Sequence, residues 1–460
     1  MTVSLDEGRL TALASSFSGS LLRPTDDGYE EARRVHNGLV DRHPALIARC
    51  LGAPDAAAAL AFARESGLPV SVRGGSHNIA GRAVIDDGVM IDLATMKDVE
   101  VDPETHTARA GGGVVWSEFN AATAAHGLAT TGGLVSTTGI AGLTLGGGLG
   151  WLMPRYGLAV DNLVSVELVS ASGEVLNVSE ESDPDLFWAL RGGGGNFGVA
   201  TTFEYRLHPL TEVVAGLVAY PFDAARDVLR FFRDFTAGTL SDDLMVLGAL
   251  VHAPDGSGAK LAAMAVCHTG SKEAADRELE PLLGFGSPAL TAVGPMPYPD
   301  ANTLLDAGYP KGALNYWKSG FLRGLDDEAI DSIVEQFATT PSTMTGIGIE
   351  HFHGAVTRVG VTETAVPHRE PGHNMFMTSV WMDPEATAAN VAWTREAYTA
   401  IRPHLADRRW LNYLDDDDGA SDVIRTAFGP NYERLADVKR RYDPENVFRS
   451  NHNIEPASAA

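Results

Sequence analysis

The chain has 460 residues, of which 44% are hydrophobic and 21% are charged, and its formal net charge is −25. This composition predicts a globular protein with a large core, divided into two or three domains. The negative charge argues against nucleic acid or an anionic membrane as a partner, since no basic patch offsets it. Cys50 and Cys267 are too few for a disulfide framework and stand in apolar runs typical of buried thiols.

The N-terminus lacks the basic and apolar regions of a secretory signal peptide. No stretch reaches the roughly 18 apolar residues that a membrane span requires. We therefore expect a soluble, cytoplasmic protein that does not insert into a membrane. A homodimer is left open.

Short apolar strands alternate with helices in the first part of the chain. The predicted strands are Ile47–Cys50, Leu68–Val72, Val89–Leu93 and Thr107–Ala110, and the predicted helices are Asp55–Glu65 and residues 117–126. Gly67 ends the first helix, and Pro54 stands where a first helical turn tolerates proline. This alternation predicts an α/β domain.

The loop Arg73-Gly-Gly-Ser-His-Asn78 follows one of these strands and turns on two consecutive glycines. Glycine lets the backbone approach a ligand closely, so that successive N–H groups converge on an anion such as a pyrophosphate. Arg73 adds positive charge, and His77 places an imidazole at the end of the loop. Taken alone, such a loop is more typical of a tight surface turn with an exposed histidine.

The segment Thr131–Gly150 is rich in glycine, with leucine, valine and isoleucine interleaved. A flexible linker would carry polar residues between the glycines instead. We therefore expect an ordered loop wrapped around a ligand.

The pattern Gly193-x-Gly195-x-x-Gly198 has the letters of a dinucleotide-binding fingerprint. That fingerprint requires a strand before it and a helix after it. Here a predicted helix (Pro184–Leu190) precedes the glycines and a predicted strand (Val199–Leu207) follows them. The sequence therefore argues against NAD binding at this position.

After about Leu210 the glycine clusters stop and the composition changes. Strand-like runs at 213–220, 245–252, 261–268, 345–352 and 375–382 alternate with helical ones at 224–236, 272–283, 327–338 and 384–401. This arrangement predicts a second, α+β domain built on one sheet with helices on one face. From Trp410 the chain is expected to return to the first domain, with a helix over Tyr432–Arg441.

Two segments of the second half carry candidate chemistry. In the strand Glu350-His-Phe-His353, a period of two directs His351 and His353 to one face and Glu350 and Phe352 to the other. A His-x-His pair can bind metal, but no third ligand stands at a suitable spacing, so we expect no metal. The acidic run Asp415–Asp418 does not fit a calcium loop and is interpreted as a solvated turn.

The loop 73–78, the glycine-rich segments 131–150 and 191–199, and the run Trp410-Leu-Asn-Tyr-Leu-Asp415 resemble a known family. They are similar to the FAD-linked oxidases of the vanillyl-alcohol oxidase/PCMH superfamily, in particular the berberine-bridge-enzyme-like group and its bacterial 6-hydroxy-D-nicotine oxidase type. The resemblance implies an α+β fold. A PCMH-type FAD-binding domain of two α/β subdomains would span residues 1–210. A substrate domain with an antiparallel sheet covered by helices on one face would span residues 211–412. Residues 413–460 would return to the FAD domain.

The resemblance also implies roles for individual residues. His77 would carry a single covalent bond to the 8α-methyl carbon of FAD, because Val135 offers no nucleophile for a second one. Residues expected to contact the cofactor are Arg73, Gly74, Gly75, Ser76, Asn78, Gly81, Val135, Thr138, Gly139, Gly142, Gly148, Gly150, Asn162, Val199, Asn446, Asn451 and Asn453. His351, His353 and Trp317 are expected to contact the substrate. Tyr413 is the candidate catalytic base, although a phenol with a pKa near 10 needs a cation or strong hydrogen bonds for that role.

The function implied is a flavoprotein oxidase that takes hydride from a small-molecule alcohol or amine. Dioxygen would be the acceptor and hydrogen peroxide the product, with the redox chemistry supplied by the cofactor. A dehydrogenase with another acceptor and a non-catalytic flavin-binding protein are the alternatives. The substrate is left open among hydroxylated N-heterocycles, sugar hemiacetals and natural-product alcohols.

Overall fold

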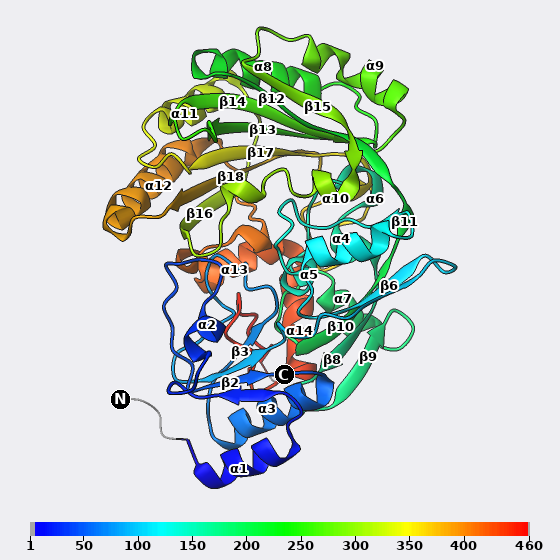
Figure 1. Ribbon diagram of the computed structural model, residues 1–460, viewed down its shortest axis with the longest axis vertical. Coiled ribbons are helices and arrows are strands. Elements are labelled where there is room, and N and C mark those ends of the chain that lie inside the picture. Colours follow the sequence, from blue (N-terminus) through cyan, green and yellow to red (C-terminus); the bar gives the residue numbers. More distant parts are fainter. Residues whose placement is uncertain (1–4, 459–460) are drawn as a thin grey trace.

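The computed structural model describes residues 5–458 as three larger sheets, with helices packed around them, and one two-stranded sheet formed by β7 (Leu128–Ala129) and β11 (His208–Pro209) (Figure 1). The first sheet has the order β1-β2-β4-β3. Its strands are β1 (Ser20–Leu22), β2 (Leu46–Arg49), β3 (Val70–Arg73) and β4 (Val89–Asp92). β4 lies between β2 and β3 and pairs in parallel with both. The helix α3 (Ala53–Glu65) connects β2 to β3, because parallel strands require a long crossover connection. The predicted strand–helix–strand unit is thus present.

The second sheet has the order β5-β6-β10-β8-β9, and all its neighbours are antiparallel. Its strands are β5 (Val99–Asp102), β6 (Thr107–Gly111), β8 (Leu163–Val169), β9 (Val175–Ser179) and β10 (Val199–Arg206). α4 (Trp116–Ala124) and α7 (Pro184–Leu190) bury Trp116, Phe119, Leu186 and Phe187 in the core beside this sheet. The glycines at 193–198 form the loop between α7 and β10, which is the helix–loop–strand order expected from the sequence.

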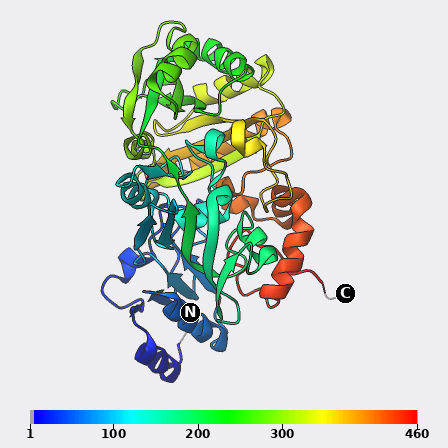
Figure 2. The same cartoon turned by 90° about the vertical axis from the view of Figure 1, so that its right-hand side faces the viewer.

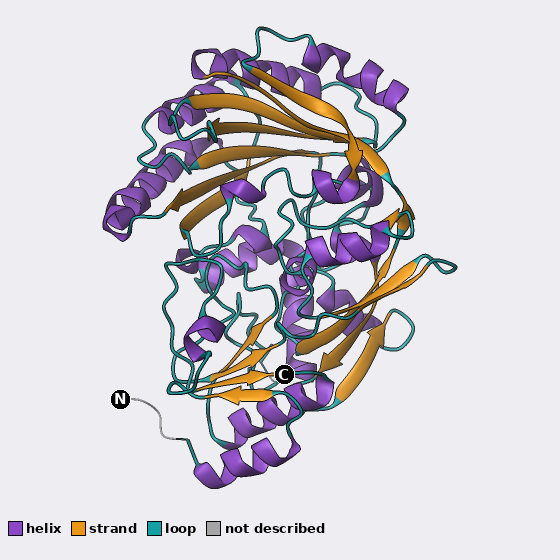
Figure 3. Ribbon diagram, in the orientation of Figure 1, coloured by secondary structure: helices purple, strands orange, loops and turns teal. Residues whose placement is uncertain are grey.

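The third sheet contains seven antiparallel strands in the order β15-β12-β14-β13-β17-β18-β16. They are β12 (Glu212–Pro221), β13 (Leu244–His252), β14 (Lys260–His268), β15 (Leu290–Pro297), β16 (Leu314–Phe321), β17 (Gly346–Phe352) and β18 (Gly372–Trp381). Its outer face is covered by α8 (Ala225–Thr236), α9 (Lys272–Leu283), α11 (Asp327–Ala338) and α12 (Thr387–Ile401). Figure 3 shows these four helices on one side of the sheet, with the rest of the molecule on the other.

Two strands of this sheet, β15 and β16, escape the sequence pattern because both are edge strands. β15 is largely exposed and contains Gly294 and Pro295. β16 mixes Asn315, Lys318 and Ser319 with aromatic residues, so it shows no clean alternation. The predicted architecture, an α/β part followed by an antiparallel sheet with helices on one face, is confirmed.

The C-terminal segment packs against the first half of the chain. α13 (Ser421–Phe428) and α14 (Tyr432–Tyr442) contribute Ile424, Phe428, Tyr432 and Leu435 to the same core as Trp188 and Phe203. Figure 2 shows α14 running along the side of the half of the molecule that contains the first two sheets. Lys439, fully buried, donates to Asp443 Oδ2 (2.6 Å) and to the carbonyl oxygen of Asn196 (2.7 Å), and these bonds fix the tail against the glycine loop.

No helix among residues 5–458 combines the length and the apolar character needed to cross a bilayer. Within the same residues, no group of three or more His, Cys, Asp or Glu side chains gathers as metal ligands do. Cys50 and Cys267 are buried free thiols.

Candidate active site

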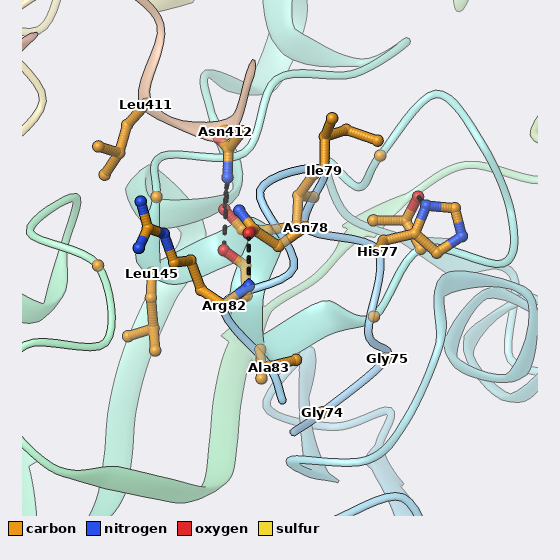
Figure 4. Close-up of a pocket in the computed structure, with 18 of the residues that line it drawn as sticks. Gly74, Gly75, His77, Asn78, Ile79, Arg82, Ala83, Leu145, Leu411 and Asn412 are labelled. Atoms are coloured by element: carbon orange, nitrogen blue, oxygen red, sulfur yellow. Dashed lines mark hydrogen bonds between the residues drawn. The ribbon is translucent and has the colours of Figure 1, made fainter. Parts of the chain in front are cut away.

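The main cavity lies between the two halves of the molecule, and the space between its walls is about 1730 Å³, part of it open to solvent. Its floor is built by the loop after β3 and by the glycine-rich segment 131–150. Its roof is built by the third sheet and the residues 410–413. Figure 4 shows residues that line this space, among them Gly74, Gly75, His77, Asn78, Ile79, Arg82 and Ala83 of the loop, together with Leu411 and Asn412.

The floor is a close crossing of two backbones. A Cβ atom built on Gly75 would lie 2.3 Å from Gly139 Cα, and one on Gly74 would lie 2.8 Å from the carbonyl oxygen of Gly112. Only glycine permits this approach, because a side chain there would require the facing backbone to move. Ser76 adopts a left-handed backbone with φ of 59°, which turns the chain sharply before His77.

His77 borders the cavity and has both ring nitrogens near threonine hydroxyls. Its Nε2 is 2.9 Å from Thr137 Oγ1, and its Nδ1 is 3.5 Å from Thr138 Oγ1. Its ring stacks on that of His36 with a centroid separation of 3.8 Å. The surrounding protein desolvates the imidazole and, with a smaller effect of His36, lowers the pKa of His77 to about 3. The ring is therefore neutral at physiological pH.

The glycine-rich segment is ordered, as expected, and contains the short helix α5 (Ile140–Leu145). Asn412 ties this helix to the roof: its Nδ2 donates to the carbonyl oxygen of Leu143 (3.1 Å), and its Oδ1 accepts from the Gly148 amide (3.3 Å). The family-like run 410–415 is thereby held beside α5, close to the cavity.

The roof is a continuous aromatic wall. Trp317 on β16 meets Tyr309 at a centroid distance of 5.6 Å and Tyr413 at 6.0 Å, and Phe376 on β18 meets Tyr413 at 5.3 Å. The Trp317 indole nitrogen donates to Asn315 Oδ1 (3.1 Å), so its polar atom is already partnered within the protein. The wall thus offers mainly apolar ring surface to a ligand.

One carboxyl group stands behind this wall. The Tyr413 hydroxyl donates to Glu350 Oε1 (2.7 Å), and Asn374 Nδ2 donates to Glu350 Oε2 (2.8 Å). Glu350 is fully buried, and burial raises its pKa. The two hydrogen bonds lower the pKa by a smaller amount, so that the net value is about 7. Burial, followed by the charge of Glu350, raises the pKa of the Tyr413 phenol well above its ordinary value near 10. Of the two groups, Glu350 is therefore the one that loses its proton near neutral pH, while Tyr413 keeps its proton.

The structure brings twelve of the predicted site residues to the cavity and leaves ten away from it. The cavity is lined by Gly74, Gly75, Ser76, His77, Asn78, Val135, Thr138, Gly139, Gly142, Trp317, Tyr413 and Asn451. The predicted residues outside its lining are Arg73, Gly81, Gly148, Gly150, Asn162, Val199, Asn446, Asn453, His351 and His353.

Two of the outlying residues have structural partners that explain their positions. Arg73 turns back into the protein, where its Nε lies 3.7 Å from Asp92 Oδ1 and its guanidinium donates to the carbonyl oxygen of Ala32. Asn162 donates to the carbonyl oxygens of Tyr156 and Leu158, both at 2.9 Å, and closes a local turn.

The expectation that His351 and His353 line the pocket is not met. His351 lies on the face of β17 that the helices cover, because its alternation opposes that of Glu350, and His353 follows directly after the strand. The His351 ring stacks on His353 (4.6 Å) and tilts against His373 (5.1 Å), whose Nε2 is 3.0 Å from Thr236 Oγ1 on α8. His353 Nε2 is 2.8 Å from the carbonyl oxygen of Leu244. The period-two pattern separated the faces correctly, but the face chosen for the pocket was the wrong one.

Several cavity residues were missed by sequence reasoning, including His36, Arg82, Asn412 and His452. His452 is 8% exposed and neither of its ring nitrogens has a hydrogen-bond partner within residues 5–458. Its position between Asn451 and Asn453, both of which were predicted, was the available signal. Nothing in the sequence marks His36.

The acidic run 415–418 forms a turn with Asp416 and Asp417 exposed, as expected, but Asp415 is buried and all four carboxylates are engaged. Its four carboxylates have different partners: Asp415 accepts from the Trp317 amide (2.8 Å), Asp416 pairs with Arg82 (3.0 Å), Asp417 pairs with Arg395 (2.7 Å) and Asp418 pairs with Lys318 (3.1 Å). These partners belong to the cavity loop, to β16 and to α12. The run therefore joins both halves of the molecule beside Tyr413.

The cavity fits a flavin dinucleotide. The touching Gly75 and Gly139 backbones leave backbone rather than bulky side chains on this part of the cavity floor, which suits a phosphate-bearing ligand. Both ring nitrogens of His452 are buried and have no hydrogen-bond partner within residues 5–458, so a bound ligand could supply one. The aromatic roof offers a flat apolar surface over the floor. In this site His77, the loop 74–78 and Asn451 would hold the cofactor.

Family models match both parts of the chain that form this site. Residues 44–179 match the FAD binding domain, and residues 410–455 match the family described as berberine and berberine like. Fold and site together define an FAD-dependent oxidoreductase.

Similar proteins cover nearly the whole chain. The (R)-6-hydroxynicotine oxidase of Paenarthrobacter nicotinovorans is 30% identical over 96% of this chain and 97% of that protein. The FAD-linked oxidoreductase YgaK of Bacillus subtilis is 29% identical over 96% of this chain and 98% of that protein. The crystal structure of 6-hydroxy-D-nicotine oxidase from Arthrobacter nicotinovorans superimposes with a TM-score of 0.87 at 29% identity, covering 96% of this chain and 99% of that one. The chain belongs to this family of FAD-linked oxidoreductases with a berberine-like C-terminal segment.

Proposed function

We propose that the protein is an oxidase that binds FAD covalently through His77 and oxidises a small apolar alcohol or amine. Bound FAD supplies the hydride acceptor, and dioxygen takes the electrons from it to give hydrogen peroxide. The observation that carries the proposal is the hydrogen bond between Tyr413, on the cavity wall, and the buried Glu350.

Tyr413 and Glu350 act together as the proton acceptor. The substrate presents its O–H or N–H to the Tyr413 oxygen, and the Tyr413 hydroxyl proton moves along the 2.7 Å hydrogen bond to Glu350 Oε1. This relay avoids a free phenolate, which the buried surroundings and the charge of Glu350 disfavour. A carboxyl whose pKa lies near the working pH is well matched to general base catalysis.

The attachment rests on the state of His77. A neutral imidazole keeps a nitrogen lone pair available for bonding to carbon, whereas an imidazolium does not. His77 stands at the end of the glycine loop and is one of the residues that line the cavity, which supports contact with a bound cofactor. Val135, at the position where a second attachment would be expected, offers no nucleophile.

The roof selects the kind of substrate. Sugars carry many hydroxyl groups, and a site that holds them needs as many hydrogen-bond partners. Leu305, Tyr309, Trp317 and Phe376 provide ring and alkyl surface instead, and the Trp317 and Tyr413 donors are already engaged. A planar, mostly apolar molecule with one protic group beside the oxidised carbon fits this wall.

A peroxide-coupled screen tests the proposal. 6-Hydroxynicotine, benzylic alcohols and benzylic amines form one set, and xylobiose and chitobiose form the other. We expect peroxide and oxygen consumption with a member of the first set and none with the sugars. Turnover of the sugars alone would contradict the substrate class. Flavin reduction without oxygen consumption would support the dehydrogenase alternative.

A further inference from the structure

His36 provides the ring that covers one face of His77. The two imidazoles are stacked with centroids 3.8 Å apart and planes inclined by 25°. His36 is 4% exposed, so it shields that face of His77 from bulk water. His77 is therefore held between an aromatic face and the two threonine hydroxyls at its edge.

The backbone around His36 is tied to the loop that carries His77. The His36 amide donates to the carbonyl oxygen of Ser76 (3.1 Å), and the Gly312 amide donates to the carbonyl oxygen of His36 (2.9 Å). These bonds hold the stacking partner in register with the residue before His77. They also connect it to the segment that leads into β16.

Asn37 continues this attachment on the far side of the loop. Its Nδ2 donates to the carbonyl oxygens of Ile79 and Asn315, both at 2.9 Å, and its Oδ1 accepts from the Asn315 amide (3.0 Å). Residues 36 and 37 thus bracket His77 from residue 76 to residue 79.

We propose that His36 is a positioning residue for the covalent attachment of FAD at His77. The stack fixes the plane of the His77 ring, and the two threonine hydroxyls fix its rotation within that plane. The inference rests on the proposed covalent attachment. It assigns no contact between His36 and the cofactor.

The electrostatics of the pair support this role. Burial, with a smaller effect of Lys311, lowers the pKa of His36 to about 4. Two imidazolium rings at 3.8 Å would repel each other, so the stack favours two neutral rings. In the net reaction one C–H bond of the 8α-methyl group and one N–H bond of His77 break, and a C–N bond forms. The two electrons and two protons released reduce the bound flavin, and dioxygen reoxidises it to yield hydrogen peroxide.

Covalent attachment can be measured apart from turnover. The full chain is expressed as wild type, His36→Ala, His36→Phe and His208→Ala, and the purified proteins are loaded with FAD. The covalent fraction is followed over time from acid-precipitated flavin and intact mass. His208 is a matched control, because it is a stacked histidine of the same domain (4.0 Å from the Tyr156 ring) that does not line the cavity.

We expect attachment in His36→Ala to slow by about 10²-fold, since ångström-scale misplacement of a reacting group has that effect. His36→Phe should recover most of the rate because it restores a flat ring on His77, and His208→Ala should match wild type. The role of the stack would be overturned if His36→Ala attached FAD at the wild-type rate. It would also be overturned if His36→Phe attached FAD as slowly as His36→Ala. A wild-type protein that never forms the bond would refute the proposed attachment itself, and the inference with it.

Discussion

The floor of the cavity is formed mainly by backbone, and its roof is formed mainly by side chains. The floor is backbone: glycine residues of two loops touch, and residues 74–78 line the cavity. The roof is side chain: Trp317, Phe376 and Tyr413 come from β16, β18 and the C-terminal segment, with Glu350 behind them. The difference separates two tasks, since a backbone floor suits a constant cofactor and a side-chain roof can change with the substrate. Substitutions in the two walls should therefore fail in different ways.

The largest effect is expected from the floor. Gly75→Ala would place a methyl group 2.3 Å from Gly139 Cα, and relieving such overlap typically costs about 1–3 kcal/mol or more. We expect the variant to be purified without bound flavin, as measured by absorbance at flavin wavelengths. Gly324→Ala is the matched control, because its Cβ would meet nothing within 4 Å. A flavin-loaded Gly75→Ala variant would show that the backbone crossing is not needed for binding.

Removing one hydroxyl from the roof should leave the flavin in place and slow the chemistry. Tyr413→Phe keeps the ring but breaks the path to Glu350. Loss of general base catalysis typically slows a reaction by about 10²–10⁴-fold, and we expect this in anaerobic flavin reduction. The covalent fraction and the reoxidation rate should match wild type. Glu350→Gln should show a similar loss, and the double variant little more, because the two residues act as a unit.

Glu350 should also make the stability of the folded protein depend on pH. Its pKa is raised in the folded state, so between about 4.5 and 7 the folded protein binds a proton that the unfolded chain has lost. Its contribution is therefore fully present below pH 4.5 and is lost as the pH rises through 7. Glu350→Gln is always neutral and should lose less stability than wild type between pH 5 and pH 8 in thermal unfolding. Parallel curves for the two proteins would argue against a buried ionisable carboxyl at this position.

The smallest effect is expected on the other face of β17. His351→Ala removes a ring that packs on His353 and His373 under the helices, so flavin reduction should stay within about twofold of wild type. Single-turnover reduction and the melting temperature should be compared, and only the latter should move. A large decrease in the rate of flavin reduction would show that His351 takes part in the reaction.

The floor could be predicted from the sequence because its chemistry is local. Consecutive glycines and a terminal histidine lie within one loop, and residues 74–78 all border the cavity as expected. The roof could be predicted only in part. Tyr413 stands in a recognisable run, but the side of β17 that faces the cavity depends on how the sheet packs on the first half of the chain.

The acidic run shows the same limit. Four adjacent aspartates read as a solvated turn, because their partners Arg82, Lys318 and Arg395 are far away in sequence. The His36–His77 stack also joins residues from separate segments, and a single histidine in a loop gives no sign of it. Long-range pairings of this kind appear only when the fold is known.

The most direct test of the Tyr413–Glu350 relay is the pH dependence of anaerobic flavin reduction, measured by stopped flow with an alcohol or amine found in the peroxide screen. The base must be ionised, so the wild-type rate should rise with pH through an apparent pKa of about 7. In Glu350→Gln this step should be absent and the rate low throughout. A Glu350→Gln variant that keeps the wild-type rate and profile would contradict the account.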